Sequence, residues 1–366
     1  MSKVVISGAN GYVASNFIVE LLNQGHRVVA LVRSRNSIPA GDRMVKALHE
    51  MGLTDDTQLK RLEVFDYSLF EENFNLPEKQ LRYIFGGQVH YFHFAASLKF
   101  DISSKEEIFG TNLQGVQHSI ETFQRFSGVN SRFYFISTAY SCGKCKGIFE
   151  EKFYDNAEIS EFRNYYEQSK RFAENVIHKY IENKKLNACI LRISQIVGNR
   201  KTGVTLTDYG IFDFSKRIQR VALRNPGSKL RLQIDPDSTQ NLLPIDTVVS
   251  YFLDIIESES LPAVLNLVSR NPITNRAIMN SLNQLLPIQL EADMALKPSE
   301  MTTMEKIIAI GMSFTGAYID INPSFDTSNL DAVIKNKQPE VTFRDIHQML
   351  EYFLLKRESQ KMKNTG

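Results

Sequence analysis

The stretch Lys3-Val-Val-Ile-Ser-Gly-Ala-Asn-Gly-Tyr-Val-Ala14 decides the fold of this chain. It opens with a β-branched run that predicts a buried strand, and a glycine-containing turn follows directly. From Ala14 to Leu22 apolar residues recur at helical spacing, and Arg27–Val32 is a second strand-like run. The order strand, glycine turn, helix and strand is typical of a unit that binds a dinucleotide.

The glycines of this turn lie where a phosphate group would approach the backbone. Gly8 and Gly11 leave room for a pyrophosphate, and Ala14 lets the helix pack closely on the strand. The alternative is a tight turn that binds no ligand. We expect cofactor contacts from Gly8, Asn10, Gly11, Tyr12 and Val13.

The end of the second strand indicates which dinucleotide binds. An NAD site usually has an acidic residue here, whereas this chain has Arg33-Ser-Arg35 and no carboxylate nearby in the sequence. Because guanidinium groups suit a 2′-phosphate, Arg33 and Arg35 predict NADP(H), with Arg33 as the main clamp. The alternative is a pair of solvated loop arginines.

Further strand-like runs alternate with helical patterns along the next part of the chain. They cover residues 61–65, 88–96, 132–136 and 186–193. This alternation predicts an α/β fold with a Rossmann-type doubly wound parallel sheet. Asp66 ends the third strand, where it would accept a hydrogen bond from the adenine amino group. Ala95 and Ala96 end the fourth, where small residues let a cofactor pass close to the backbone.

The alternation loosens past residue 200, which predicts two regions. Residues 1–200 would form the NADP-binding Rossmann domain. Residues 201–366 would be mainly a substrate-binding region, with segments at about 240–270 returning to the Rossmann core.

Tyr166 and Lys170 stand four residues apart in a segment with a helical pattern. That spacing places both side chains on one helix face. An ammonium beside a phenol favours the phenolate and lowers the tyrosine pKa, which would suit Tyr166 to acid–base work at a carbonyl oxygen. A surface pair without function is the alternative.

Ser137 and Thr138 supply hydroxyl groups at the end of the fifth strand. The carboxyl ends of strands in open α/β sheets are where ligands bind. The position relative to Gly143 favours Thr138 as the working hydroxyl, and Ser137 is the alternative. Asn112 interrupts a long helical pattern, where its amide can hold a kink or a water.

Together these motifs resemble the extended short-chain dehydrogenases/reductases of the NAD-dependent epimerase/dehydratase superfamily. The resemblance covers most of the chain. Three stretches are similar to the thioester-reductase branch, which includes fatty acyl-CoA reductases: Ile136-Ser-Thr-Ala-Tyr140, Tyr166-Glu-Gln-Ser-Lys170 with Glu174, and Arg192–Gly203. Ile193 replaces a usual proline of that branch, and Ala14 a more frequent glycine.

The resemblance implies a role for each matching residue. Thr138 would be the active-site hydroxyl and Tyr166 the proton donor. Lys170 would hold the nicotinamide ribose, and Asn112 would support a proton relay. Ile193 and Ser194 would also contact the cofactor.

The expected function is that of an NADPH-dependent reductase acting on a small-molecule or carrier-bound acyl substrate. An acyl thioester, attached to CoA or to a carrier protein, would be reduced to an aldehyde or an alcohol. A nucleotide-sugar epimerase or dehydratase, or a ketone reductase, is the first alternative. A catalytically silent NADP-binding regulator is the second.

Composition argues against several other classes. The 366 residues carry 43 basic and 41 acidic side chains, so we expect no nucleic-acid partner. No apolar stretch approaches the roughly 20 residues that span a bilayer, and no signal peptide is evident. Cys142 and Cys145 have the spacing of half a zinc site or a redox pair, but no second Cys/His pair at metal-ligand spacing is evident, so we expect free thiols and no metal site. We expect a cytoplasmic protein. Whether it forms a homodimer stays open.

Overall fold

The computed structural model describes residues 2–184, 186–311, 318 and 321–365. The chain divides into two compact units. The first unit consists of Met1–Ile193, Val249–Leu267 and Ser324–Asn336, and the second of Ser194–Val248, Val268–Pro323 and Lys337–Gly366. Two segments therefore return to the first unit, and the sequence indicated a return only at about residues 240–270.

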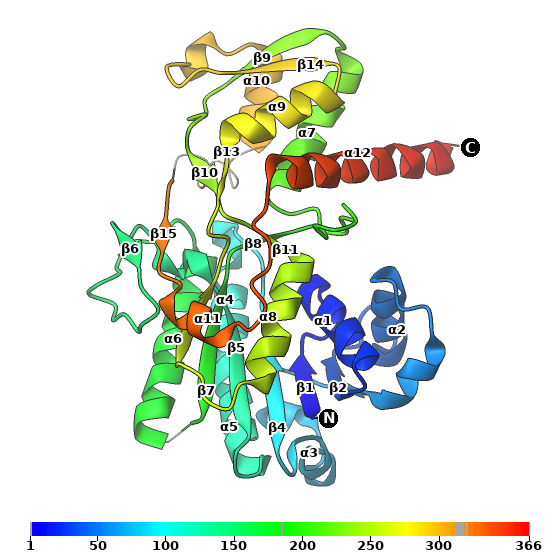
Figure 1. The fold of residues 1–366 in the computed structure, drawn as a ribbon, viewed down its shortest axis with the longest axis vertical. Coiled ribbons are helices and arrows are strands. Elements are labelled where there is room, and N and C mark those ends of the chain that lie inside the picture. The colour runs from blue at the N-terminus through cyan, green and yellow to red at the C-terminus, as the bar shows by residue number, and fades with distance from the viewer. Residues whose placement is uncertain (1, 185, 312–317, 319–320, 366) are drawn as a thin grey trace. The chain divides into compact units, whose positions relative to one another are not determined.

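Seven parallel strands form the sheet of the first unit. In spatial order they are β12 (Val264–Leu267), β7 (Ala188–Ile193), β5 (Arg132–Thr138), β4 (Val89–His93), β1 (Lys3–Ser7), β2 (Arg27–Val32) and β3 (Leu62–Asp66). The order of connection reverses between β1 and β4 (Figure 1). This topology confirms the predicted doubly wound α/β fold.

Helices cover both faces of this sheet. One layer contains α3 (Glu78–Phe85), α5 (Gly115–Phe126) and α6 (Tyr165–Lys184). The other contains α1 (Tyr12–Asn23) and the part of α8 (Ile245–Glu257) that starts at Val249. In the second layer Phe17 of α1 lies 5.0 Å from Phe92 of β4 and 5.1 Å from Phe252 of α8, between ring centroids. Burial of such rings provides a large share of the apolar contact that holds the layers on the sheet.

The remaining elements of the first unit are short. They are α2 (Ala40–Glu50), α4 (Lys105–Phe109), a π-helical turn (Gly110–Gln114), β6 (Ile148–Phe149), β15 (Ser324–Phe325), α11 (Ser328–Val333), and 3-10 turns at Asp56–Arg61, Glu72–Asn75, Ile102–Ser104 and Ala139–Cys142. The π-helical turn contains Asn112, and α4 and α5 lie on either side of it.

The second unit has its own apolar core, which includes Phe212, Leu230, Leu282 and Met349. Its elements are β8 (Gln195–Val197), α7 (Ile211–Arg224), β9 (Ser228–Leu232), β10 (Thr239–Gln240), β11 (Leu242–Pro244), β13 (Ile273–Thr274), α9 (Asn275–Leu285), β14 (Ile288–Ala292), a 3-10 turn (Pro298–Glu300), α10 (Thr303–Gly311) and α12 (Phe343–Thr365).

Glu151 ties the returning segment Ser324–Asn336 to the edge of the sheet. Its carboxylate accepts hydrogen bonds from the backbone amides of Asn266 on β12, at 2.7 Å, and of Leu330 on α11, at 3.2 Å. The amide of Asn329 is a third donor. Burial raises the pKa of Glu151 to about 7, and the nearby Asp326 adds to that shift.

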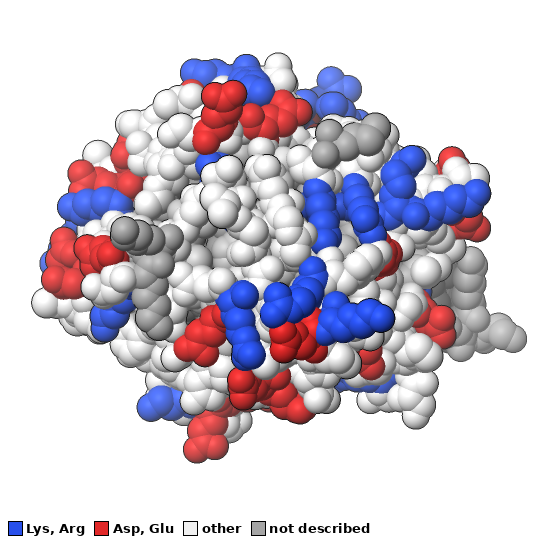
Figure 2. Space-filling model, turned by 90° about the horizontal axis from the view of Figure 1, so that it is seen from below, with Lys and Arg blue, Asp and Glu red and all other residues white. Residues whose placement is uncertain are grey.

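The face of the molecule drawn in Figure 2 has basic side chains interspersed with acidic ones. Among the described helices, none is both long and apolar enough to cross a membrane.

Candidate active site

Most residues predicted for the cofactor and for catalysis in the first unit lie at the carboxyl ends of its parallel strands. The strands are parallel, and Ser7 lies in register with Leu31 on one side and with His93 on the other. Asp66 is paired with Val32 in the same way. The ends of β1 to β5 therefore bring together segments that lie far apart in the sequence.

The glycine turn has the close backbone approach that a phosphate site needs. Gly8 has a φ of +67°, and a Cβ atom there would lie 2.8 Å from the backbone nitrogen of Ala95. Gly11 donates its N–H to the carbonyl of Gly8 at 3.0 Å. Helix α1 begins at Tyr12, directly after the turn, so its positive N-terminal end lies there. No described side chain caps this end. These features fit a dinucleotide pyrophosphate.

The adenosine end of the predicted cofactor site differs from expectation in one respect. Arg33 and Arg35 are exposed after β2, as a 2′-phosphate clamp requires. However, a carboxylate does lie nearby in space, because Asp66 accepts hydrogen bonds from the backbone and the hydroxyl of Ser34 at 2.9 and 2.6 Å. The sequence could not reveal this, since β2 and β3 are separated by the helix α2.

Helix α2 also supplies a third cation that sequence reasoning missed. The guanidinium of Arg43 donates to the backbone carbonyl of Arg33. Its charge also helps to lower the pKa of Asp66, after the larger effect of the Ser34 hydrogen bonds. Arg43 lies outside every motif of the sequence analysis, so no motif pointed to it.

Lys170 fixes the start of α6 against the end of β5. Its ammonium donates to the carbonyl of Ile136 at 2.7 Å and lies 4.7 Å from the ring centroid of Phe135. Ile136 lies two residues before Thr138 on β5, so this bond anchors the start of α6 to the strand that ends in Thr138. Burial lowers the pKa of Lys170 to about 7.

The prediction that the pKa of Tyr166 is lowered is wrong. Loss of solvent around the phenol raises its pKa, and the charge of Glu167 acts in the same direction. Desolvation of the phenolate outweighs any help from Lys170, whose own charged form is disfavoured by burial. Tyr166 is therefore a protonated phenol at neutral pH. The rings of Phe100 and Tyr166 pack in a T-shaped arrangement with centroids 5.3 Å apart, and no sequence motif indicated this neighbour.

Asn112 uses its amide to hold two neighbouring segments. Its oxygen accepts from the backbone N–H of Ser97 at 2.7 Å, and its nitrogen donates to the Ser97 carbonyl at 3.1 Å. The same nitrogen donates to the hydroxyl of Ser169 at 3.0 Å, and that hydroxyl bonds the carbonyl of Tyr166. Asn112 thus links the π-helical turn to α6, and its part in a proton relay stays a prediction.

The two candidate hydroxyls have different surroundings. Ser137 donates to the carboxylate of Glu174 at 2.5 Å, while Thr138 accepts from the backbone N–H of Tyr140 at 3.2 Å. The proton of Ser137 is therefore committed to Glu174, whereas that of Thr138 stays available for a ligand oxygen. This difference favours Thr138.

The predicted residues after β7 fall on both sides of a unit boundary. Ile193 ends β7 in register with Thr138. Ser194 begins the second unit, where its hydroxyl is buried and has no hydrogen-bond partner within the described part of the chain. Ala96, the other small residue after β4, is partly exposed, whereas Ala95 is buried against Gly8.

Residues 6–252 match the family described as male sterility protein, whose sequence model is that of an NAD-binding region. The chain belongs to this family. The match confirms the resemblance to the extended short-chain dehydrogenases/reductases and the prediction of an NAD(P)-dependent enzyme. A search of curated protein sequences gave no significant match.

Solved structures support the fold of this family member. The terminal R domain from the myxalamid PKS-NRPS biosynthetic pathway is similar with a TM-score of 0.79 and 18% identity, covering 98% of this chain and 92% of that one. A thiolation-reductase di-domain from an archaeal non-ribosomal peptide synthetase gives 0.78 and 18%, covering 98% and 76%. UDP-glucuronic acid 4-epimerase from Bacillus cereus, in complex with NAD, gives 0.65 and 17%, covering 97% and 99%.

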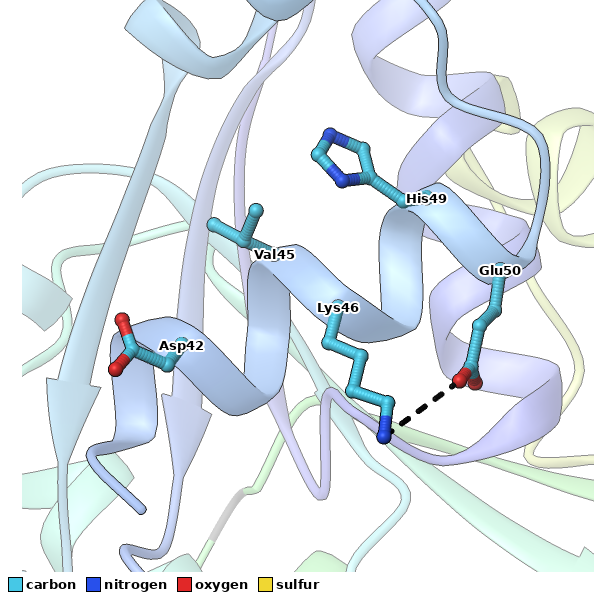
Figure 3. Close-up of a pocket in the computed structure, with 5 residues that line it drawn as sticks. All are labelled: Asp42, Val45, Lys46, His49 and Glu50. Carbon is cyan, nitrogen blue, oxygen red and sulfur yellow. Dashed lines mark ion pairs between the residues drawn. The ribbon is translucent and has the colours of Figure 1, made fainter.

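Three further features were candidates for a functional site: the cysteines, potential metal ligands and a surface hollow. Cys142 and Cys145 are free thiols, and the described residues include no group of three or more potential metal ligands. A surface hollow lies along α2, lined by Asp42, Val45, Lys46, His49 and Glu50 (Figure 3). Its lining comes from one helix and includes none of the predicted catalytic residues, so we assign it no role.

Proposed function

We propose that the protein is an NADPH-dependent reductase whose substrate is an acyl thioester. The observation that carries the proposal is the hydrogen bond from Lys170 to Ile136, which anchors the start of α6, where Tyr166 lies, to the strand that ends in Thr138. Two hydroxyl donors beside one carbonyl oxygen can stabilise the negative charge that develops on it.

The residues of the chain have distinct tasks in this reaction. When bound, NADPH supplies a hydride to the carbonyl carbon. Tyr166 and Thr138 hold the carbonyl oxygen, and Tyr166 gives it a proton, a role that suits a phenol kept protonated by burial. Lys170 would hold the nicotinamide ribose next to them.

A thioester requires one step more than a ketone. Hydride addition and protonation give a hemithioacetal, and its collapse breaks the carbon–sulfur bond and releases a thiol and an aldehyde. A second hydride and proton would convert the aldehyde to an alcohol at the same residues. Support for a thioester comes from the family and from the likeness to reductase domains named for PKS-NRPS pathways. Whether CoA or a carrier protein delivers the acyl group is part of the proposal to be tested.

NADPH is proposed over NADH because three cations gather at the end of β2. Arg33 and Arg35 are exposed there, and Arg43 on α2 donates to the backbone carbonyl of Arg33. A 2′-phosphate would gain charge-assisted hydrogen bonds from such groups, whereas a 2′-hydroxyl would not.

The proposal is tested by following NADPH consumption with octanoyl-CoA and with octanal, and with NADH in parallel. Thiol release is measured separately with a disulfide reagent. Octanoyl-CoA turnover with thiol release, lost in Tyr166→Phe and reduced in Thr138→Ala, is the expected result. Arg125→Ala, an exposed change on α5, serves as the control variant.

Other outcomes would reassign the protein. Octanal turnover without thiol release would make it an ordinary carbonyl reductase. Binding of NADPH with no turnover of either probe would contradict the proposal and favour a nucleotide-sugar enzyme or a regulator. Binding of a UDP-sugar would then separate these two.

A further inference from the structure

Three fully buried charged side chains lie behind the end of β5. The carboxylate of Glu174 on α6 stands between the guanidinium groups of Arg171 and Arg192, and none of the three is exposed. Its Oε2 atom accepts from Arg171 at 2.6 Å and from Arg192 at 2.7 Å. We call these three residues, together with Ser137 and Ser141, which also bond to Glu174, the Glu174 cluster.

The cluster reaches the backbone on both sides of Thr138. The Oε1 atom of Glu174 accepts from the hydroxyl of Ser137 at 2.5 Å and from that of Ser141 at 2.8 Å. Arg171 adds two hydrogen bonds to the Ser141 carbonyl, both at 3.1 Å. The chain segment that carries Thr138 is therefore held at the residue before it and again three residues after it.

Stability alone does not account for such an arrangement. Two guanidinium groups share one carboxylate, so the buried set of three charges has a net charge of +1. Removing ions from water is costly, and apolar residues of similar volume often stabilise a core as well or better. Buried, fully bonded ionic networks do fix a local conformation closely, since each member loses much if it moves.

We propose that Glu174 is a positioning residue that presents the Thr138 hydroxyl to the substrate oxygen. It does so by binding Ser137 and Ser141, which fixes the turn from β5 into the 3-10 segment Ala139–Cys142. The inference rests on the proposed function, in which Thr138 donates to that oxygen. Glu174 itself touches neither substrate nor cofactor in this account.

This role also explains why two adjacent hydroxyls are present. Ser137 has a single proton, and it donates that proton to Glu174. Ser137 is then the link between cluster and strand, and Thr138 is the residue it orients. Removal of the Ser137 hydroxyl breaks the link while Glu174, Arg171 and Arg192 keep their mutual bonds.

The main test variant is Ser137→Ala, because Glu174→Gln leaves two buried cations without a counter-charge and is expected to unfold more easily. The matched control is Ser119→Ala on α5, which removes a buried hydroxyl bonded to Tyr91. Each change is made in the wild-type background and in Thr138→Ala, and kcat and KM for octanoyl-CoA are measured with NADPH.

A positioning role predicts strong coupling between Ser137 and Thr138. Ser137→Ala should lower kcat about tenfold with little change in KM, since misplacement of a catalytic group mainly affects the chemical step. In the Thr138→Ala background the same change should lower kcat less than twofold. Equal losses in both backgrounds would overturn the inference, and so would full activity of Ser137→Ala.

A second measurement does not depend on the substrate. The amide of Tyr140 donates to Thr138 Oγ1, so its hydrogen exchange reports whether Thr138 is held in place. Ser137→Ala should speed this exchange about tenfold, and Ser119→Ala should not change it. Unchanged exchange in Ser137→Ala would refute the positioning role even if octanoyl-CoA is no substrate. Faster exchange with no activity on any thioester would refute the proposed function alone.

Discussion

The carboxylate of Asp66 binds Ser34 twice, accepting from its backbone N–H at 2.9 Å and from its hydroxyl at 2.6 Å. Ser34 stands between Arg33 and Arg35, so this pair fixes the loop from which both guanidinium groups extend. A carboxylate engaged in this way is a poor partner for a ribose 2′-hydroxyl. The relationship favours recognition of a 2′-phosphate by the arginines.

Replacement of Arg33 should therefore change cofactor preference. Arg33→Ala is expected to raise the Kd for NADPH by about tenfold to a hundredfold, because a hydrogen bond between charged groups contributes about 1.5–3 kcal/mol. The Kd for NADH should change little. Fluorescence titration of the reduced cofactors measures both constants, and Arg125→Ala is the control. Equal weakening of both cofactors would contradict a 2′-phosphate clamp.

The glycine turn gives a prediction about stability and binding together. In Gly8→Ala the new Cβ would lie 2.8 Å from the nitrogen of Ala95, on a backbone with φ of +67°. The left-handed conformation alone costs roughly 1–2 kcal/mol, and the clash adds to it. We expect a lower melting temperature and loss of NADPH binding. In Gly41→Ala on α2 the new Cβ would have no atom within 4 Å apart from its chain neighbours and the backbone of its own helix, so this variant should retain both properties.

Lys170 should make folding stability increase with pH. Its pKa is about 7 in the folded chain, against an ordinary 10.5. Between these values the unfolded chain binds a proton that the folded chain does not, so the free energy of unfolding rises with pH. The contribution is up to about 2 kcal/mol between pH 7 and 9. Urea denaturation of the cofactor-free protein should show this rise, and Lys170→Met should remove it. The exposed control Lys46→Met should keep the rise. If the rise also persists in Lys170→Met, groups other than Lys170 cause it.

Glu151 should act in the opposite direction at lower pH. Its pKa is raised from 4.5 to about 7, so between these values the folded chain holds a proton that the unfolded chain has lost. This group's contribution to stability is present at pH 4.5 and falls as the pH rises to 7. In Glu151→Gln the amide oxygen can still accept from the backbone, and the fall should disappear. Melting temperatures at pH 5 and 7 test this, with the exposed Glu150→Gln as control. An unchanged difference between the two pH values would show that Glu151 does not titrate there.

The fold could be predicted because it depends on local patterns. The β-branched run before Gly8 and the helical spacing after it indicate the first strand, turn and helix within one short stretch. The parallel sheet then follows from repetition of that pattern. The returning segment Ser324–Asn336 could not be predicted in this way, because Glu151, far away in sequence, anchors it through backbone amides. Because every residue except proline has a backbone N–H, the residue types of Asn266, Asn329 and Leu330 do not indicate these hydrogen bonds.

Residue types in the sequence indicate the candidate site, whose residue roles stay predictions, but they do not indicate its electrostatics. Tyr166 and Lys170 are adjacent on α6 as their spacing requires, but the sign of the tyrosine shift depends on burial, which spacing does not report. Asp66 and Ser34 meet because β2 and β3 pair in register. The partners of Glu174 lie on different strands and loops, so no single motif could assemble them.

The way the chain crosses between its two units limits how the protein can be taken apart or recombined. The crossings fall after Ile193, Val248, Leu267, Pro323 and Asn336. A fragment that stops at Ile193 would lack β12, and Glu151 would lose all three of its backbone donors. Exchange between homologues at a single junction after Ile193 would also replace β12 and Ser324–Asn336, so the first unit would be assembled from two proteins. A working chimera needs grafts at all five crossings, whereas point substitutions within Val268–Pro323 leave the first unit's own chain intact.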